Sequence, residues 1–327
     1  MKNNLIDIIS DPIRHELLEF EKIFKSSLDS KVKIINTIIN YIIRNKGKQF
    51  RPILCLLCAK LTGEKINHTT YLSASTVEIL HIATLIHDDV VDDAYIRRGW
   101  PTINKIWKNK LSILIGDFMF SRSLINISKH NEMESINILA TISERLSEGE
   151  IFQIEKAISK DMDEASYFKM VSDKTASLIS ASCLLGLITN NNDNTMKKSI
   201  KNFGEYFGIA YQLKDDIFDV IGNIDDSGKD GHLDLKKNML TLPYIYILSK
   251  LGKSQKKNLI LKLKNNVKKN EIGDLRNTIN DMGGIKYTNT KIKEFSERAS
   301  NELDCFPDSE YKASLLKAVE FNCNRIK

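Results

Sequence analysis

Apolar residues recur every three or four positions through most of this 327-residue chain. The spacing is clear in the segments 32–42, 136–146 and 315–319, and it places apolar side chains on one face of an α-helix. No stretch keeps the two-residue alternation of a half-buried strand. The pattern is interrupted at Gly47-Lys48, near Gly99-Trp100-Pro101, from Asn190 to Asn194 and from Gly222 to Gly231. It therefore predicts about a dozen helices.

Composition supports a single helical domain. The chain has only 15 Gly and 5 Pro, too few turn residues for a many-stranded protein of this length. Hydrophobic residues make up 42% and charged residues 28%, which suits a soluble globular protein and excludes collagen-like, disordered and disulfide-scaffold classes. We expect one all-α domain over residues 1–327, with its helices arranged as a bundle.

The cysteines and the N-terminal segment indicate a cytoplasmic protein. Cys55 and Cys58 form a C-x-x-C, but they lie in an apolar run without a second such pair, so we interpret them as small core residues. The cysteine count is odd, and Asp7 and Pro12 interrupt the segment where a signal peptide would need unbroken apolar residues. No apolar window is predicted to span a membrane.

The net charge of +6 and the pI near 8.8 suit anionic substrates and transient contact with an anionic membrane surface. The Lys- and Asn-rich segment 259–269 contains no interleaved aromatic residues, so it predicts a solvated helix face and not a nucleic-acid site.

Two acidic clusters with the pattern D-D-x-x-D lie within apolar helical segments. The first spans Asp88 to Asp92 and the second spans Asp215 to Asp219. Carboxylates four residues apart share a helix face and repel each other, and nearby aliphatic residues add a desolvation cost. A cation is therefore expected at each pair, and Mg²⁺ suits oxygen ligands with positions left for water and phosphate.

Basic residues flank these clusters in the manner that a phosphate-ester substrate requires. Lys48 and Arg51 precede the first cluster, Arg97 and Arg98 follow it, and Lys174 begins an apolar run in which it needs an anionic partner. Arginine suits bidentate phosphate contact, and lysine supplies a point charge.

The ordered set G-K-x-x-R-P, two D-D-x-x-D motifs and Thr241-Leu242-Pro243 resembles the trans-isoprenyl diphosphate synthases, or polyprenyl synthetases, over nearly the whole chain. The resemblance implies the isoprenoid synthase fold, a helical bundle around a central cavity. It also implies a Mg²⁺-dependent prenyltransferase that extends an allylic diphosphate with isopentenyl diphosphate. It further implies three Mg²⁺ ions per site, a homodimer, and a role in making quinone side chains.

The resemblance also assigns roles to individual residues. The implied metal ligands are Asp88, Asp92 and Asp215. Asp89, Asp216 and Asp219 support them, and Asp216 and Asp219 also belong to the metal-binding residues. Asp89 and Lys174 belong to the catalytic residues. The implied clamp for isopentenyl diphosphate consists of Lys48, Arg51, His81 and Arg98. The implied contacts to the allylic diphosphate are Arg97, Lys174, Thr175 and Gln212.

Ala83 and Thr84 lie about one turn before Asp88, on the side of the helix along which the product grows in the family. A large aromatic side chain at either position would stop growth early, whereas both residues here are small. We therefore expect a long product, heptaprenyl to nonaprenyl; the alternative is a geranylgeranyl or farnesyl product. The small side chain of Ala83 is also explained if it only allows a neighbouring helix to pack closely.

Three other classes of protein share single features with this sequence. The pair His87-Asp88 is typical of metal phosphohydrolases, but such sites need more histidines than the sequence places nearby. A terpene cyclase has a different second metal motif, with Asn, Ser and Glu. A non-catalytic partner subunit should have lost one acidic motif, whereas both are intact here.

The chain departs from the family at Met239, where a lysine usually precedes the Thr-Leu-Pro element by two residues. Because one diphosphate contact is then missing, we predict an active enzyme that binds its allylic substrate more weakly. Met239→Lys should lower the KM for the allylic diphosphate in steady-state kinetics. An unchanged KM would contradict the interpretation.

Overall fold

The computed structural model describes residues 5–63, 65–129, 132–159, 161–221, 240–252, 254–256, 259 and 271–325. Met239 and the basic residues near it, Lys229, Lys236 and Lys237, lie outside these ranges, so the expectation about Met239 stays a prediction. The chain forms two compact units. Unit 1 comprises Met1–Ile142, Leu178–Gly204 and Glu302–Ala318, and unit 2 comprises Ser143–Ser177, Glu205–Asn301 and Val319–Lys327.

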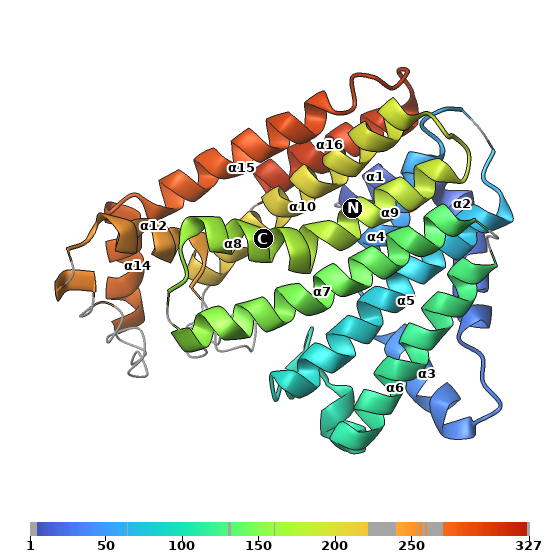
Figure 1. Cartoon of the computed structure of the whole chain (residues 1–327), viewed down its shortest axis with the longest axis horizontal. Helices are drawn as coiled ribbons and strands as arrows, with labels where there is room; N and C mark the ends of the chain where they lie inside the picture. The colour runs from blue at the N-terminus through green and yellow to red at the C-terminus, as the bar shows by residue number, and fades with distance from the viewer. Residues whose placement is uncertain are drawn as a thin grey trace. The chain divides into compact units, whose positions relative to one another are not determined.

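The described chain is helical apart from one two-stranded hairpin, which confirms the all-α prediction (Figure 1). Unit 1 contains α1 (Leu5–Ser10), the 3-10 turn η1 (Asp11–Ile13), α2 (Arg14–Ser27), α3 (Lys33–Arg44), α4 (Phe50–Ala59), α5 (His68–Val91), β1 (Ile96–Arg97), β2 (Trp100–Pro101) and α6 (Ile103–Ser128). Unit 2 contains α8 (Glu164–Val171), the π-helical turn η2 (Ser172–Ala176), α12 (Leu242–Lys250), α14 (Glu271–Asp281) and α15 (Gly284–Asn301). Residues of both units occur in α7 (Met133–Ser159), α9 (Ser177–Ile188), α10 (Asn194–Ile221) and α16 (Glu310–Asn324).

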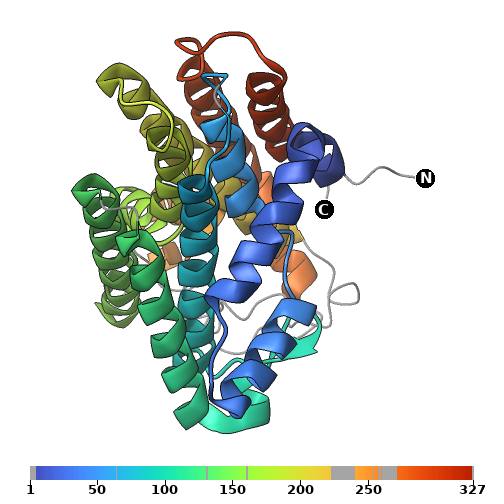
Figure 2. The same ribbon diagram turned by 90° about the vertical axis from the view of Figure 1, so that its right-hand side faces the viewer.

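Helix α5 is the centre of unit 1. It begins after Asn67, whose side-chain oxygen accepts a hydrogen bond from the Thr70 N–H at 2.9 Å and so caps the helix. Helices α6, α4 and α2 pack around it, and the N-terminal helices lie alongside it in Figure 2. Most of its side chains are therefore buried, and the polar groups near its C-terminal end are fixed by a rigid element.

Helix α4 is buried from Pro52 to Ala59, which explains its continuous apolar sequence. Cys55 and Cys58 lie on it with no exposed surface, and burial raises the pKa of the Cys55 thiol, which stays protonated. No group of three or more candidate ligands that could hold a metal ion occurs among the described residues. The prediction that these two cysteines are core residues is confirmed.

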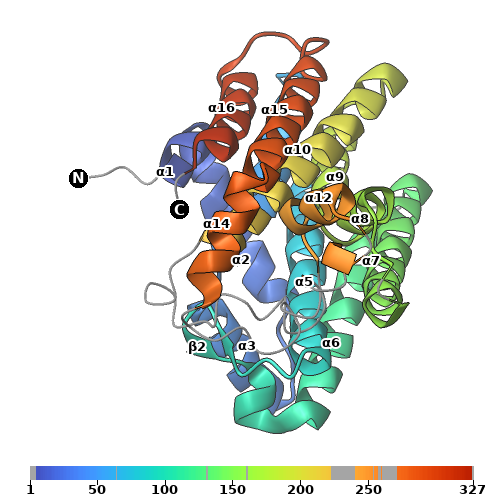
Figure 3. The ribbon, with the colours of Figure 1, turned by 90° about the vertical axis from the view of Figure 1, so that its left-hand side faces the viewer.

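Unit 2 is built around a core that α8, η2, α10, α12 and α15 share, and its largest buried members include Tyr167, Leu213 and Phe295. Helix α12 packs against α15 and α14 (Figure 3). Thr241 lies just before α12, and Pro243 occupies its first turn, where the missing N–H costs nothing.

Two helical stretches, Ile103–Ser128 and Glu164–Ile188, are long and apolar enough to cross a membrane by length and composition alone. In the second, 83% of the most apolar window is buried inside the protein, as in a core helix, whereas in the first the share is 39%. Core helices of soluble proteins pass the same test, so the expectation that no segment crosses a membrane stays a prediction.

Candidate active site

The first acidic motif lies at the C-terminal end of α5. Asp88 and Asp89 belong to its last turn, and Asp92 caps the helix, with its N–H donating to the Asp88 carbonyl at 2.8 Å. The helical spacing therefore continues through the motif, and Asp88 and Asp92 lie one turn apart as predicted. Both are half-buried at the end of a helix that packing holds in place.

Asp89, between them, has a different environment. It is only 6% exposed, and its Oδ1 accepts a hydrogen bond from Arg97 Nε at 2.8 Å and forms an ion pair with Arg97 Nη2, also at 2.8 Å. The Asn104 amide donates to the Asp89 backbone carbonyl at 3.1 Å. Asp89 thus fixes Arg97 next to the motif and compensates its charge.

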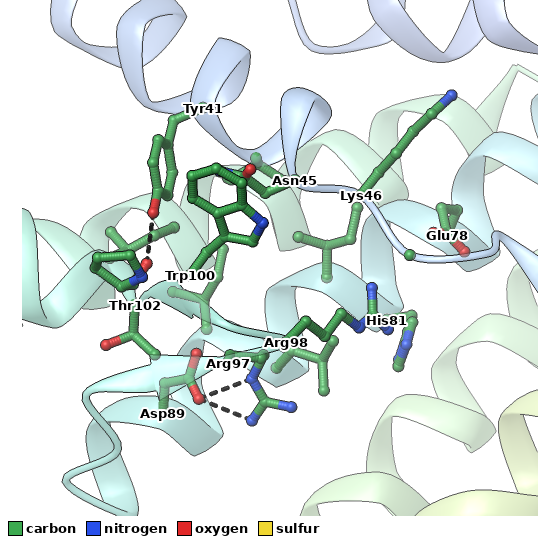
Figure 4. Close-up of a pocket in the computed structure, with 17 residues that line it drawn as sticks. Tyr41, Asn45, Lys46, Glu78, His81, Asp89, Arg97, Arg98, Trp100 and Thr102 are labelled. Atoms are coloured by element: carbon green, nitrogen blue, oxygen red, sulfur yellow. Dashed lines mark hydrogen bonds and ion pairs between the residues drawn. The ribbon is translucent and has the colours of Figure 1, made fainter. Parts of the chain in front are cut away.

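A cavity of about 100 Å³ opens beside this motif in unit 1 (Figure 4). Its basic and polar wall includes Lys46, His81, Arg97 and Arg98, and Gly47 lies at the same wall. Most of the remaining lining is apolar and comprises Tyr41, Ile42, Ile82, Leu85, Ile86, Trp100, Pro101 and Ile103. The structure therefore combines several cations with an apolar surface, as a small phosphate ester with a hydrocarbon part requires.

The β1–β2 hairpin directs Arg98 into this wall. Arg98 and Gly99 both have positive φ, at 53° and 82°, and together they form the turn between the strands. A Cβ atom at Gly47 would lie 1.9 Å from the Arg98 Nη1, so a side chain at this position would displace the guanidinium from its present place.

His81 projects from α5 toward the same cations (Figure 4). Burial, and then the positive charges of Arg51, Arg98 and Arg97, lower the pKa of His81 well below its usual value. The ring is therefore neutral at physiological pH and keeps one N–H for donation. Of the other predicted clamp residues, Arg51 lies in the first turn of α4, whereas Lys48 is exposed and does not line the cavity.

Two residues at this cavity were missed in the sequence analysis. Lys46 lines the cavity and also pairs with Glu21. Glu78 is 5% exposed; burial raises its pKa, and the charges of Arg51, Arg98 and Lys46 lower it. A signal was available for Glu78, because it is a lone carboxylate in an apolar run, three residues before His81 on the same helix face.

The second acidic motif lies on α10 in unit 2. Asp215 is half-buried and Asp219 is exposed, one turn apart on one helix face. Asp216 is 3% exposed, and it accepts hydrogen bonds from the Tyr167 hydroxyl and, at 2.8 Å, from the Gln212 amide. In both motifs the second aspartate is thus buried and bonded to fixed donors, whereas the first and the last are more accessible.

The predicted allylic contacts in unit 2 are joined to this motif by hydrogen bonds. The Thr175 hydroxyl donates to Gln212 Oε1 at 2.9 Å, and Gln212 in turn donates to Asp216. Lys174 forms an ion pair with Glu150 at 2.5 Å and donates to Gln153 Oε1 at 3.1 Å. The anionic partner expected for Lys174 is therefore Glu150.

Asp215 has a partner that the sequence did not reveal. Arg325, which follows α16, forms an ion pair with Asp215, and its guanidinium lies 4.8 Å from the ring centres of Tyr211 and Phe218. Burial raises the pKa of Asp215, and the Arg325 charge lowers it. No local pattern connects two residues that are 110 positions apart in the chain.

The donor set of each motif fits a hard divalent cation. Each motif presents two carboxylates one turn apart on one helix face. A site of this kind leaves coordination positions for water and phosphate oxygens, which is the preference of Mg²⁺.

Comparison with known proteins identifies the family. Residues 32–282 match the sequence profile of the family described as polyprenyl synthetase. The octaprenyl diphosphate synthase of Haemophilus influenzae is 30% identical over 302 residues, 92% of this chain and 91% of that protein. The all-trans-nonaprenyl-diphosphate synthase (geranyl-diphosphate specific) of Rhodobacter capsulatus is 28% identical over 98% of both chains.

A solved structure agrees with this result. The polyprenyl synthase from Caulobacter crescentus, complexed with calcium and isoprenyl diphosphate, superposes with a TM-score of 0.90, 26% identity and 98% coverage of each chain. The chain therefore belongs to the polyprenyl synthetase family, whose members are metal-dependent, and it is a prenyltransferase. The resemblance stated from its motifs, the isoprenoid synthase fold and the enzyme class are confirmed.

The buried hydrogen bond from Tyr167 to Asp216 gives a stability prediction. Tyr167→Phe leaves a buried carboxylate with one donor fewer, and it should lower the free energy of unfolding by about 1 to 3 kcal/mol. The control Tyr95→Phe removes the hydroxyl oxygen from a tyrosine that is 56% exposed and should change the free energy of unfolding by less than about 0.5 kcal/mol. Urea denaturation at neutral pH measures both, and equal effects would contradict the role given to Tyr167.

Proposed function

We propose that the protein is an all-trans polyprenyl diphosphate synthase that makes a long-chain quinone side-chain precursor. In this reaction the allylic carbon loses its diphosphate, the double bond of isopentenyl diphosphate attacks that carbon, and a proton is lost. The observation that carries the proposal is the joint presence of paired carboxylates, fixed cations and an apolar wall. The sequence motifs and the relatives support the same reaction.

Asp88, Asp92, Asp215 and Asp219 would hold Mg²⁺, three ions per site as the resemblance implies. Bound Mg²⁺ supplies Lewis-acid stabilisation of the departing diphosphate. Asp89 and Asp216 support these ligands from buried positions, because each is bonded to fixed donors of its own unit.

The cations have separate tasks. Arg51, His81 and Arg98 bind the diphosphate of isopentenyl diphosphate in unit 1, where neutral His81 donates a hydrogen bond close to the charges of the two arginines; Lys48 adds a point charge. In unit 2, Lys174, Thr175 and Gln212 contact the allylic diphosphate, and their bonds to Glu150, Gln153 and Asp216 orient them before it binds. Arg97 assists the allylic diphosphate from its position on Asp89. Donors fixed in advance stabilise the charge that develops on the leaving group without reorganisation.

The long product rests on Ala83 and Thr84. Ala83 is 2% exposed and offers no bulk. The Thr84 hydroxyl donates its hydrogen bond to the His81 carbonyl of the same helix at 2.8 Å. The Thr84 methyl group is therefore the part of the side chain that would contact a hydrocarbon chain. The octaprenyl and nonaprenyl products in the relatives' names support the heptaprenyl-to-nonaprenyl range.

A homodimer, a cytoplasmic location with transient membrane-surface contact and one synthetase domain over residues 1–327 belong to the same proposal. Helix α6 supports the dimer, because Ile113, Leu114, Leu124 and Ile125 are 41–54% exposed on it. An apolar helix face of this kind is typical of a subunit contact.

Product analysis tests the function. Purified protein is given farnesyl diphosphate, excess isopentenyl diphosphate and Mg²⁺, and mass spectrometry should detect a prenyl diphosphate of roughly 35 to 45 carbons, as expected for small residues one turn from the metal ligands. EDTA should abolish the product. A product near the farnesyl or geranylgeranyl length would keep the chemistry and overturn the long chain. No product with any allylic starter would favour a non-catalytic partner subunit.

Ala83→Phe tests the path of the growing chain. The ring would project from α5 about one turn from Asp88, into the proposed path of the chain, so the main product should become shorter by several isoprene units while the rate of the first condensation is retained. Ala74→Phe, another buried alanine on α5 more than three turns from Asp88, is the control for a general packing defect. An unchanged product distribution in an active Ala83→Phe enzyme would refute the assignment.

A further inference from the structure

The helical stretch from Glu164 to Ile188 is interrupted by the π-helical turn η2 at Ser172–Ala176. A π turn adds one residue to a turn of α-helix; it is rare, occurs mostly as a single turn inside an α-helix, and is frequent at functional sites. Lys174 and Thr175, the two residues of this stretch that contact the allylic diphosphate in the proposed function, both lie in η2. The inference below rests on that proposed function.

The extra residue decides where these two side chains point. One residue corresponds to about 100° of rotation around a helix axis. If η2 relaxed to α-helix, Lys174 and Thr175 would rotate relative to α8 and lose their alignment with Gln153 and Gln212. The hydrogen bonds at 3.1 Å and 2.9 Å to these two glutamines therefore depend on the turn.

Arg145 on α7 holds the start of η2. Its Nε donates to Asp173 Oδ1 at 2.8 Å, and its Nη2 donates to Ser172 Oγ at 2.7 Å and to Glu205 Oε1 at 3.1 Å. Lys169 adds an ion pair with the other Asp173 oxygen at 2.8 Å. The Arg145 and Asp173 side chains are 24% and 13% exposed, so these charge-assisted hydrogen bonds are largely shielded from water.

Two glycines let neighbouring helices approach the same turn. A Cβ at Gly149 of α7 would lie 3.0 Å from the Asp173 Cβ and 3.1 Å from the Lys174 nitrogen. A Cβ at Gly208 of α10 would lie 2.5 Å from the Ala176 Cα. The backbone of η2 is thus enclosed by α7 and α10. The Arg145 guanidinium, on α7, bonds Ser172 and Asp173 of η2 and also Glu205 of α10, so this single group links the start of η2 to both helices.

We propose that Arg145 is a positioning residue for the allylic diphosphate: by holding η2 in its π-helical form, it aligns Lys174 and Thr175. Arg145 does not touch the substrate, because its donors are directed at Ser172, Asp173 and Glu205. Its planar fork is required, since a lysine supplies one point charge and cannot bond all three groups in this geometry.

Steady-state kinetics of Arg145→Lys tests this role. The variant keeps the charge and should fold. Its KM for the allylic diphosphate should rise at least about tenfold, as expected when binding groups are misaligned. Its KM for isopentenyl diphosphate should stay within about twofold of the original value, because that clamp belongs to other residues. The matched control is Arg298→Lys on α15, an arginine of the same unit that stacks 4.0 Å from the Tyr206 ring centre and should leave both KM values unchanged.

Adding Arg145→Lys to the double variant Lys174→Ala/Thr175→Val separates a positioning role from a general effect on stability. Because Arg145 acts through Lys174 and Thr175, Arg145→Lys should add little to the allylic KM of Lys174→Ala/Thr175→Val. Multiplicative effects, equal increases in both KM values, or an unchanged allylic KM would each overturn the inference. If Lys174→Ala/Thr175→Val alone leaves the allylic KM unchanged, the assignment of these two residues fails and the inference with it. If Lys174→Ala/Thr175→Val raises the allylic KM but Arg145→Lys does not, the inference about Arg145 fails while the assignment of Lys174 and Thr175 stands.

Discussion

The repulsion and desolvation of carboxylates placed on buried helices is the constraint on which the rest of this structure depends. Two ionised groups one turn apart on an apolar helix are unfavourable unless donors or cations compensate them. In both motifs the second aspartate, Asp89 or Asp216, is buried and bonded to an arginine or to a tyrosine and a glutamine. In the pair Asp215 and Asp219, the ion pair with Arg325 compensates Asp215. Mg²⁺ bound as proposed would supply further positive charge at both pairs.

The same constraint connects the carboxylates to the substrate contacts. Arg97 is bonded to Asp89, and Gln212, which also bonds Thr175, is bonded to Asp216. Each structural aspartate therefore orients a residue that is predicted to contact diphosphate. A substitution at either aspartate would disturb both metal binding and substrate binding, so kinetics of these variants alone cannot separate the two effects, whereas variants of their partners can.

Much of the fold and of the site was predictable, because it depends on local periodicity. The helices, the one-turn spacing of Asp88 and Asp92 and the core position of Cys55 follow from patterns within a few residues. The π turn at Ser172–Ala176 and the ion pair of Asp215 with Arg325 do not. They result from tertiary contacts between distant segments, for which a single sequence carries no pattern.

The cavity of unit 1 shows why a basic clamp can exist before its ligand binds. Arg51, Arg97 and Arg98 raise the cost of another positive charge, and together with burial they keep His81 neutral. Arg97 is paired with Asp89, while Glu78 is buried close to Arg51 and Arg98 and burial opposes its ionisation. A diphosphate bound at this wall would interact favourably with the guanidinium charges, so ligand binding and local stability would be coupled through the same groups.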